Sequence, residues 1–338
     1  MMEVHTLGKL IYNEWIKYFN RLGTWIMLAL IIVFMLLPVV LTMQFGSTKY
    51  DSKTYGDNWK TEVKQDIKEM QQELVKINKK KEKDRSIDDY NKLSSYDERI
   101  SELSFYLKKD VQPPAKNDVY GEMLGVNNFV PFIAIMIIVL CSSLMSREHQ
   151  QGTIKLLLIR PASRIKIFTS KLIFTFIASF IFLLFGYLVK FIISMFTSEM
   201  NPTSKIAVKS GEEMKYKMVE FMPLLMKHFF NEYIYIVIFA VIAYALSVLF
   251  RNTSLSMGVT FTLLFFADII VMFLQSKTDL VKYLWPANWW LNQYNTDHIM
   301  PLPVDDMTYT FSFIYNIIAL LIVIIVTAFI FKKRDVAN

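Results

Sequence analysis

The chain has 338 residues, of which 54% are hydrophobic and 15% aromatic, and its formal net charge is +7. A mean hydropathy of +0.33 excludes an ordinary soluble domain of this length. Six long apolar windows predict membrane helices, because about 20 apolar residues cross a bilayer and lipid satisfies no backbone hydrogen bond. The expected class is an all-α membrane protein whose six spans lie at 24–43, 126–145, 168–196, 229–249, 255–274 and 312–331.

Basic residues predict the orientation of these spans. The N-terminus, residues 146–171, residues 250–254 and the C-terminus together hold 13 Lys and Arg against four Asp and Glu. Short basic loops face the cytoplasm, so we expect both termini inside and the chain in a bacterial cell membrane. The excess charge is juxtamembrane, which excludes nucleic acid as the partner and makes the lipid bilayer the first one.

Residues 1–23 are predicted to form an interfacial amphipathic helix before the first span. Its apolar residues have helical spacing and its polar residues lie elsewhere on the wheel. Such a helix either only anchors the chain on the inner surface, or its polar face also contacts a cytoplasmic partner. Glu14, Trp15 and Lys17 are the residues singled out in it, with Trp15 on the apolar side and Lys17 on the polar side. The span at 24–43 is not followed by a small-x-small cleavage site, so we expect it to be retained.

Residues 44–125 are expected to form an extracellular domain. Apolar residues step by three and four from Val63 to Ile77 and again from Tyr96 to Leu107, separated by a highly charged turn. This pattern predicts helices over about 58–79 and 87–109, packed as an antiparallel coiled-coil hairpin. A cap for the outer mouth, a partner-binding stalk and a ligand sensor are all open roles for it.

Two further outer segments have local signals. Ser210 and Glu213 have the spacing of a capping box, which predicts a short surface helix with apolar residues from Met214 to Leu225. The aromatic segment 283–294 surrounds Pro286 with tryptophan and tyrosine, the residues that favour a membrane interface. We expect it to be a re-entrant or interfacial piece.

Motifs for catalysis and metal binding are absent from the sequence. It has no phosphate-cradling loop, no HExxH and no Gly-x-Ser-x-Gly, and its four histidines are scattered, so we expect neither an enzyme nor a metal site. The lone Cys141 excludes a disulfide framework within the chain. Two ionisable residues, Asp268 and Lys190, lie within apolar runs. Asp268 either lines a substrate path, pairs with another span or sits at a wet end, and Lys190 either snorkels or pairs with it.

The polar segment 147–164, REHQQGTIKLLLIRPASR, separates two spans and lies in the predicted inner loop 146–167. Gly152 loosens a turn, Thr153 can cap the helix that follows, and Pro161 stops it. The prediction is a short helix parallel to the membrane. A rigid piece of this kind can pass movement from a cytoplasmic partner into both adjoining spans.

This segment resembles the cytoplasmic loop of type-2 ABC transporter permeases, through the pattern E-x-x-x-G-T-x-x-x-L-L-x-x-P-x-S-R after the second of six spans. The N-terminal Asn13-Glu14-Trp15 and the turn at Phe250-Arg251-Asn252-Thr253 are similar to that family as well. The resemblance implies a partner ATPase pair that binds ATP and Mg, a second permease copy, and no cofactor on this chain. It implies coupling roles for residues at the edge, start and end of the loop: Arg147, Glu148, Gly152, Thr153, Leu157, Arg160, Pro161 and Arg164.

The sequence therefore predicts a permease subunit of an ATP-driven exporter for an amphipathic or lipid-like substrate such as a peptide, an antibiotic or a lipid-linked polymer. Two alternatives stay open. In one, the chain is a sensor or immunity protein that detects antimicrobial peptides with the extracellular hairpin. In the other, it is an ion-coupled transporter that uses Asp268 and needs no ATPase.

Overall fold

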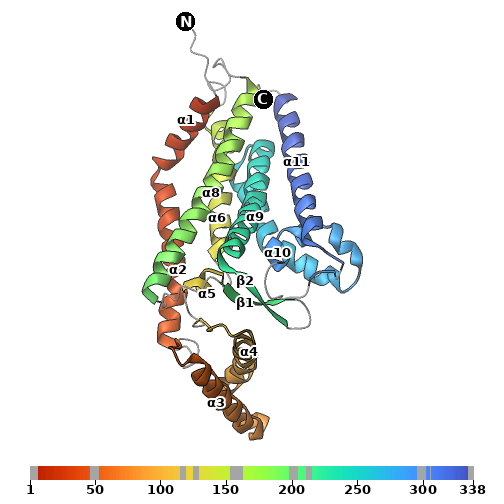
Figure 1. The fold of residues 1–338 in the computed structure, drawn as a ribbon. Coiled ribbons are helices and arrows are strands. Elements are labelled where there is room, and N and C mark those ends of the chain that lie inside the picture. The colour runs from red at the N-terminus through yellow and green to blue at the C-terminus, as the bar shows by residue number, and fades with distance from the viewer. Residues whose placement is uncertain are drawn as a thin grey trace. The chain divides into compact units, whose positions relative to one another are not determined.

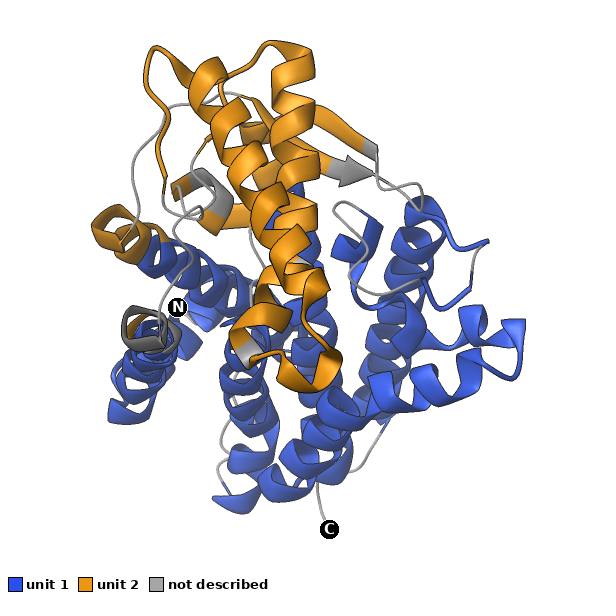
Figure 2. Ribbon diagram, turned by 90° about the horizontal axis from the view of Figure 1, so that it is seen from below, with its two compact units in different colours: residues 1–38, 126–190, 227–338 blue, residues 39–125, 191–226 orange. Residues whose placement is uncertain are grey.

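The computed structural model describes residues 7–45, 53–114, 119–124, 129–152, 163–197, 205–210, 215–294, 302–304 and 306–333. Figure 1 shows its helices and strands, and Figure 2 shows the two compact units into which the chain divides. Unit 1 comprises residues 1–38, 126–190 and 227–338, and unit 2 comprises residues 39–125 and 191–226. The chain therefore leaves unit 1 twice and returns to it twice, and three long helices run from one unit into the other.

Long apolar helices make up most of unit 1. They are α1 (Leu7–Phe19), α2 (Leu22–Phe45), α6 (Phe129–Gln150), α8 (Arg164–Thr197), α9 (Phe221–Phe250), α10 (Thr253–Gln275) and α11 (Tyr309–Lys333). The last five are each long and apolar enough to cross a bilayer, and α1 with the first part of α2 forms a pair bent by 68° that provides a sixth span if it crosses as one. This architecture is that of an α-helical membrane protein.

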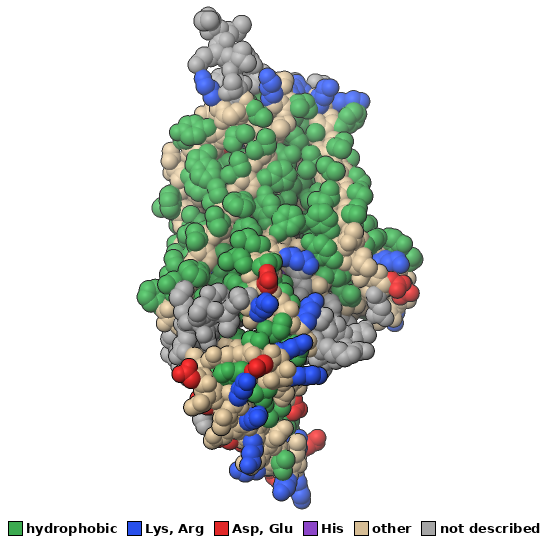
Figure 3. Space-filling model, in the orientation of Figure 1, with side chains coloured by type: hydrophobic (Ala, Val, Ile, Leu, Met, Phe, Trp, Pro, Cys, Tyr) green, Lys and Arg blue, Asp and Glu red, His purple; other side chains and the backbone are tan. Residues whose placement is uncertain are grey.

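The helices of unit 1 differ in how deeply they are buried. In α6 and α9, 78% of the most apolar window is buried, whereas in α10 and α11 the share is 22% and 17%. Hence α6 and α9 form the core, and α10 and α11 present apolar side chains at the surface. Hydrophobic side chains cover a broad part of the face seen in Figure 3. Helices α6 and α8 approach closely at Gly186, where a Cβ atom would lie 2.6 Å from Ile133 Cδ1.

Unit 2 contains the helices α3 (Trp59–Lys79) and α4 (Ile87–Lys109), where the sequence predicted helices over 58–79 and 87–109. They pack on a core that includes the fully buried Val63, Met70 and Leu103. A short 3-10 helix (Glu82–Asp84) lies in the charged connection. The helix α4 begins with a capping box in which Ser86 and Asp89 exchange hydrogen bonds, and the short α5 (Val119–Leu124) follows.

The predicted surface helix after Ser210 is wrong over residues 215–220, which form a strand. Strands β1 (Lys205–Ser210) and β2 (Lys215–Glu220) pair antiparallel, and α9 begins only at Phe221. Ile206 and Val208 are two residues apart and so lie on one face of the strand, and both are buried. Pairing with β1 outweighs the local capping signal, whose Glu213 lies outside the described residues.

The aromatic segment forms three consecutive 3-10 helices, Asp279–Tyr283, Trp285–Asn288 and Leu291–Tyr294. Asn288 is fully buried, and its side-chain amide donates to the backbone carbonyl oxygens of Lys282 and Leu284 at 2.9 and 3.0 Å. These hydrogen bonds stabilise the end of the first 3-10 helix. The backbone carbonyl oxygen of Asn288 accepts from the Asn316 amide of α11 at 2.6 Å. The irregular backbone is thus satisfied by side chains.

Candidate functional site

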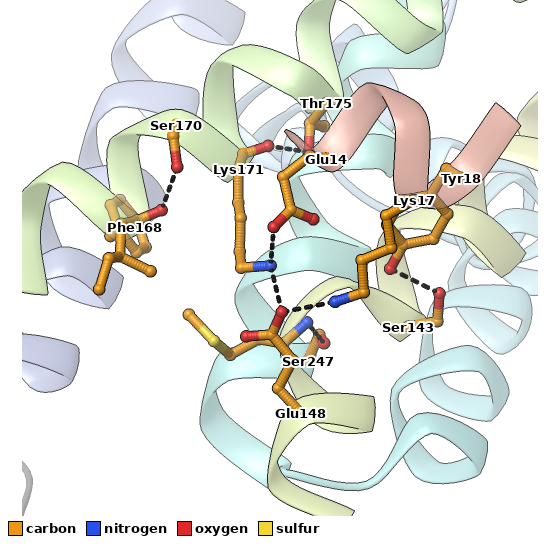
Figure 4. Close-up of polar contacts among 12 residues, drawn as sticks. Glu14, Lys17, Tyr18, Ser143, Glu148, Phe168, Ser170, Lys171, Thr175 and Ser247 are labelled. Atoms are coloured by element: carbon orange, nitrogen blue, oxygen red, sulfur yellow. Dashed lines mark hydrogen bonds and ion pairs between the residues drawn. The ribbon is translucent and has the colours of Figure 1, made fainter. Parts of the chain in front are cut away.

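A buried lysine joins three helices of unit 1. Lys171, near the start of α8, has no exposed surface. Its ammonium nitrogen lies 2.7 Å from Glu14 Oε1 of α1 and 2.9 Å from Glu148 Oε1 of α6 (Figure 4). Both carboxylates are themselves buried. Segments more than 100 residues apart in sequence are therefore connected through one charged group.

A second ammonium group balances the charge. Lys17 Nζ, on the same helix as Glu14, lies 2.6 Å from the Glu148 oxygen that Lys171 also contacts. We call Glu14, Lys17, Glu148 and Lys171 the ion cluster. It holds two positive and two negative groups, which is the condition for keeping charges out of water, since an unpaired buried charge is very costly.

Packing around the ion cluster fixes the ends of the helices. The Tyr18 hydroxyl lies 3.2 Å from Ser143 Oγ of α6, and the Tyr18 ring stacks on Phe174 of α8. On the other side of α6, Ser247 Oγ of α9 accepts from the backbone N–H groups of Met145 and Ser146 at 3.1 and 3.0 Å. The last turns of α6 are therefore clamped to α1, α8 and α9.

Directly after the ion cluster, α6 ends at Gln150, and the turn that follows contains Gly152. The φ angle of Gly152 is +67°, and its N–H donates to the His149 carbonyl oxygen. A left-handed glycine is a common way to end a helix. Ser163 Oγ accepts from the Lys166 N–H at 3.3 Å and caps the start of α8. The segment between these two ends, with the predicted coupling residues Thr153, Leu157, Arg160 and Pro161, lies outside the described residues.

The other residues predicted for the loop and for the interfacial helix lie partly in the ion cluster. Among the described ones, Glu14 and Lys17 of the helix and Glu148 of the loop belong to it. Arg147 is exposed, Arg164 donates to the carbonyl oxygen of Lys332 at 3.5 Å, and Trp15 stacks on Phe19. The structure therefore joins the predicted N-terminal helix to the first residues of the predicted loop.

The two candidates for a substrate path lie on different helices, Lys190 on α8 and Asp268 on α10. Asp268 is exposed on α10, in a row of exposed apolar side chains that includes Phe265 and Ile269. The Lys190 ammonium lies 5.6 Å from the Phe129 ring centroid. The pairing of Lys190 with Asp268, one of the alternatives for these two residues, stays a prediction.

A second buried polar group lies at the other end of α8. Tyr187 donates to Glu232 Oε2 at 2.7 Å, and the Asn292 amide donates to Glu232 Oε1 at 3.3 Å. Asn231 in turn donates to Asn292 Oδ1 at 2.9 Å and accepts from Tyr309. We call these five residues the Glu232 network. It ties α8, α9 and α11 to the last 3-10 helix.

Comparison with known proteins places this arrangement in a family. The model of a protein family of unknown function, DUF2705, matches residues 91–337. The chain belongs to the DUF2705 family. It is 28% identical over 333 residues to the uncharacterized protein YhcI of Bacillus subtilis, which covers 97% of this chain and 99% of that protein. It is also 28% identical over 218 residues to the uncharacterized membrane protein YdbK of the same organism, covering 63% of this chain and 83% of YdbK.

This DUF2705 chain is a membrane protein, because its long apolar helices and its similarity to YdbK point to the same class.

Two of its buried ionisable residues are not predicted from the sequence. Lys171 was counted with the loop cations, and Glu232 was treated as part of an apolar span. A signal for Lys171 was present, because a long apolar run begins directly after it.

Proposed function

We propose that this chain is the membrane subunit of an ATP-driven exporter and that a separate ATPase pair docks on segment 147–164. Two observations support the proposal. The segment resembles the coupling loop of type-2 ABC permeases, and the ion cluster connects its first residues to the N-terminal helix and to α8. The second observation carries the proposal, because a docking segment needs a firm connection to the spans that it moves.

The ion cluster supplies such a connection. Removing one partner of a buried ion pair costs about 3–5 kcal/mol. A force that displaces Glu148 therefore moves Lys171 and Glu14 with it before the pairs separate, and α1, α6 and α8 respond as one body. Movement of this rigid-body kind is a common form of transmission between a partner and a membrane domain.

The proposal includes the finer topology. Six spans place both termini in the cytoplasm of a bacterium, and the α3–α4 hairpin lies outside the cell as a coiled coil. Two permease copies form the path, and ATP and Mg bind only to the ATPase. The substrate is amphipathic or lipid-like, because the apolar helices carry few charged groups. Asp268, exposed on α10, is a candidate for the lining of that path.

Reconstitution tests the proposal. The chain is co-expressed with candidate ABC ATPases from the same organism, any complex is purified, and ATP hydrolysis in liposomes is measured against candidate substrates. Glu148→Gln should reduce substrate-stimulated hydrolysis by about fivefold or more, in the range of ordinary coupling free energies. Asp97→Asn, at an exposed position of α4, is the matched control and should leave hydrolysis unchanged.

Two outcomes would refute the proposal. One is net transport by the purified chain without any nucleotide-hydrolysing partner. The other is a proven complex in which Glu148→Gln and Asp97→Asn behave alike.

A sensor or immunity protein is the second candidate, because unit 2 is a compact unit with its own hydrophobic core. Deletion of residues 58–110 separates the two functions. Loss of a response to antimicrobial peptides with transport retained would favour sensing, and loss of transport alone would favour the exporter.

A further inference from the structure

The two-stranded sheet of unit 2 has one covered edge. β1 and β2 pair with Ala207 opposite Met218 and with Ile206 opposite Val219. The Ala207 N–H donates at 2.8 Å to the hydroxyl of Tyr106, on α4. Since this N–H points away from β2, the outer edge of β1 faces α4 and is closed to another strand.

The hydrogen bond from Ala207 to Tyr106 also determines which backbone N–H and C=O groups of β2 point away from β1. Opposed residues of an antiparallel pair alternate between hydrogen-bonded and non-hydrogen-bonded positions. Because Ala207 donates to Tyr106, the Ala207–Met218 pair is a non-hydrogen-bonded one. The N–H and C=O of Met218 therefore point away from β1, along the outer edge of β2. Within the described ranges, no hydrogen bond to either group is found.

An edge of this kind is a template for a further strand. Two strands alone are of marginal stability, and a third adds both backbone hydrogen bonds and packing. Extended peptides bind to sheet edges in this way, with main-chain hydrogen bonds giving affinity and alternate side chains giving specificity.

The charge of the sheet selects the occupant. The two strands hold four lysines and one glutamate, and the lysines Lys205 and Lys217 are exposed. A second copy of β2 would bring the same basic strand against itself, and edge lysines are a known guard against such pairing. An acidic segment is attracted to this edge instead.

We propose that the outer edge of β2 binds an extended acidic peptide as a third strand of the sheet. The register predicts the side-chain pattern. A residue opposite Met218 lies on the face of Met218 and Tyr216, so an apolar residue fits there. Its neighbour lies opposite Lys217 on the other face, so an acidic residue fits there. The preferred peptide alternates acidic and apolar residues. This inference does not rest on ATP-driven transport, because binding involves this chain alone.

Binding is tested on the purified full-length chain in detergent by fluorescence anisotropy. The probe is a fluorescein-labelled hexapeptide of alternating glutamate and valine, and its control alternates lysine and valine. We expect the acidic peptide to bind at least about tenfold more tightly, and Lys217→Glu to reverse the preference. Two N-methylated forms of the acidic peptide are compared, one methylated at the odd-numbered and one at the even-numbered residues. One of the two forms should bind more weakly by about tenfold or more, since its methyl groups remove the hydrogen bonds to the edge.

Two variants at one position complete the test. Met218→Pro removes an N–H that the edge offers but the β1–β2 ladder does not use, so it should weaken binding by about tenfold, whereas Met218→Ala should leave affinity within about threefold. The N-methylated peptides decide the question even if the proline variant does not fold. Equal affinity for acidic and basic peptides would overturn the proposal. Equal affinity for the N-methylated and unmodified acidic peptides would also overturn it. So would a disulfide that forms between two copies of the Met218→Cys chain and prevents the peptide from binding.

Discussion

Replacing Lys171 with methionine is the sharpest test of the ion cluster. The substitution keeps the length and apolar stem of the side chain and removes the ammonium group from a position with no exposed surface. Glu148 keeps Lys17, whose ammonium lies 2.6 Å away. Glu14 keeps nothing equivalent, because its other oxygen has no hydrogen-bond partner among the described residues.

The cost therefore falls mainly on Glu14. Removing one partner of a buried ion pair destabilises a protein by about 3–5 kcal/mol, and we expect Lys171→Met to lie in this range. Lys17→Met removes a cation whose side chain is 33% exposed, and its effect should be smaller than that of Lys171→Met, because Glu148 keeps its contact with Lys171. Adding Glu14→Gln to Lys171→Met should recover about 1–3 kcal/mol, because the neutral amide no longer needs a counter-charge.

Thermal unfolding of the detergent-solubilised chain, followed by tryptophan fluorescence, measures these differences. Lys171→Met should lower the Tm by on the order of 5–10 °C, and the double variant should regain much of that loss. The reasoning is refuted if Lys171→Met and Lys17→Met unfold at the same temperature, or if Glu14→Gln makes Lys171→Met worse.

Three further predictions concern single sites. A hydrogen bond from Lys80 lowers the pKa of Asp89 to about 2. The stability that Asp89 gives unit 2 is therefore complete above its unfolded pKa of about 3.9 and is lost as the pH falls towards 2. Hydrogen exchange of the α3–α4 amides measures this loss, and Asp89→Asn should remove its dependence on pH. Gly186→Ala should destabilise the chain by about 1–3 kcal/mol through overpacking, whereas Gly258→Ala, with nothing within 4 Å of the added Cβ, should stabilise α10 by about 0.5–1 kcal/mol; thermal unfolding compares the two. Gly152→Ala should cost about 1 kcal/mol, because its φ is +67°, and Gly152→Asn should cost less in the same assay.

Each of these predictions has a contradicting result. If acid reduces the protection of the α3–α4 amides from hydrogen exchange equally in the unmodified chain and in Asp89→Asn, the loss of stability comes from other carboxylates. Equal unfolding temperatures for Gly186→Ala and Gly258→Ala would mean that α6 and α8 separate without cost. A Gly152→Ala variant as stable as Gly152→Asn would show that the left-handed turn is not needed.

Regular periodicity made much of the fold predictable. The spans follow from apolar runs, and the helices of unit 2 follow from steps of three and four, such as Val63, Ile67 and Met70, because a helix brings such residues to one face. Glu14, Lys17 and Glu148 were singled out as candidates for partner contact, and the structure brings these three together.

The rest depends on contacts between distant parts of the chain. Strand β2 was predicted to lie in a helix, because the capping spacing of Ser210 and Glu213 is local and the pairing with β1 is not. Lys171 was assigned to a basic loop, since its two carboxylate partners are 157 and 23 residues away in sequence. Spacing along the chain does not encode which charges meet after the helices pack.

The ion cluster also sets an order for biogenesis. Glu14 and Glu148 leave the ribosome before Lys171, so each enters the membrane region while its main counter-charge is still unsynthesised. A nascent chain that stops short of α8 presents two carboxylates with only Lys17 to balance them. We therefore expect a chain truncated just before residue 171 to be less stable than the full chain, because its two carboxylates lack the ammonium group of Lys171.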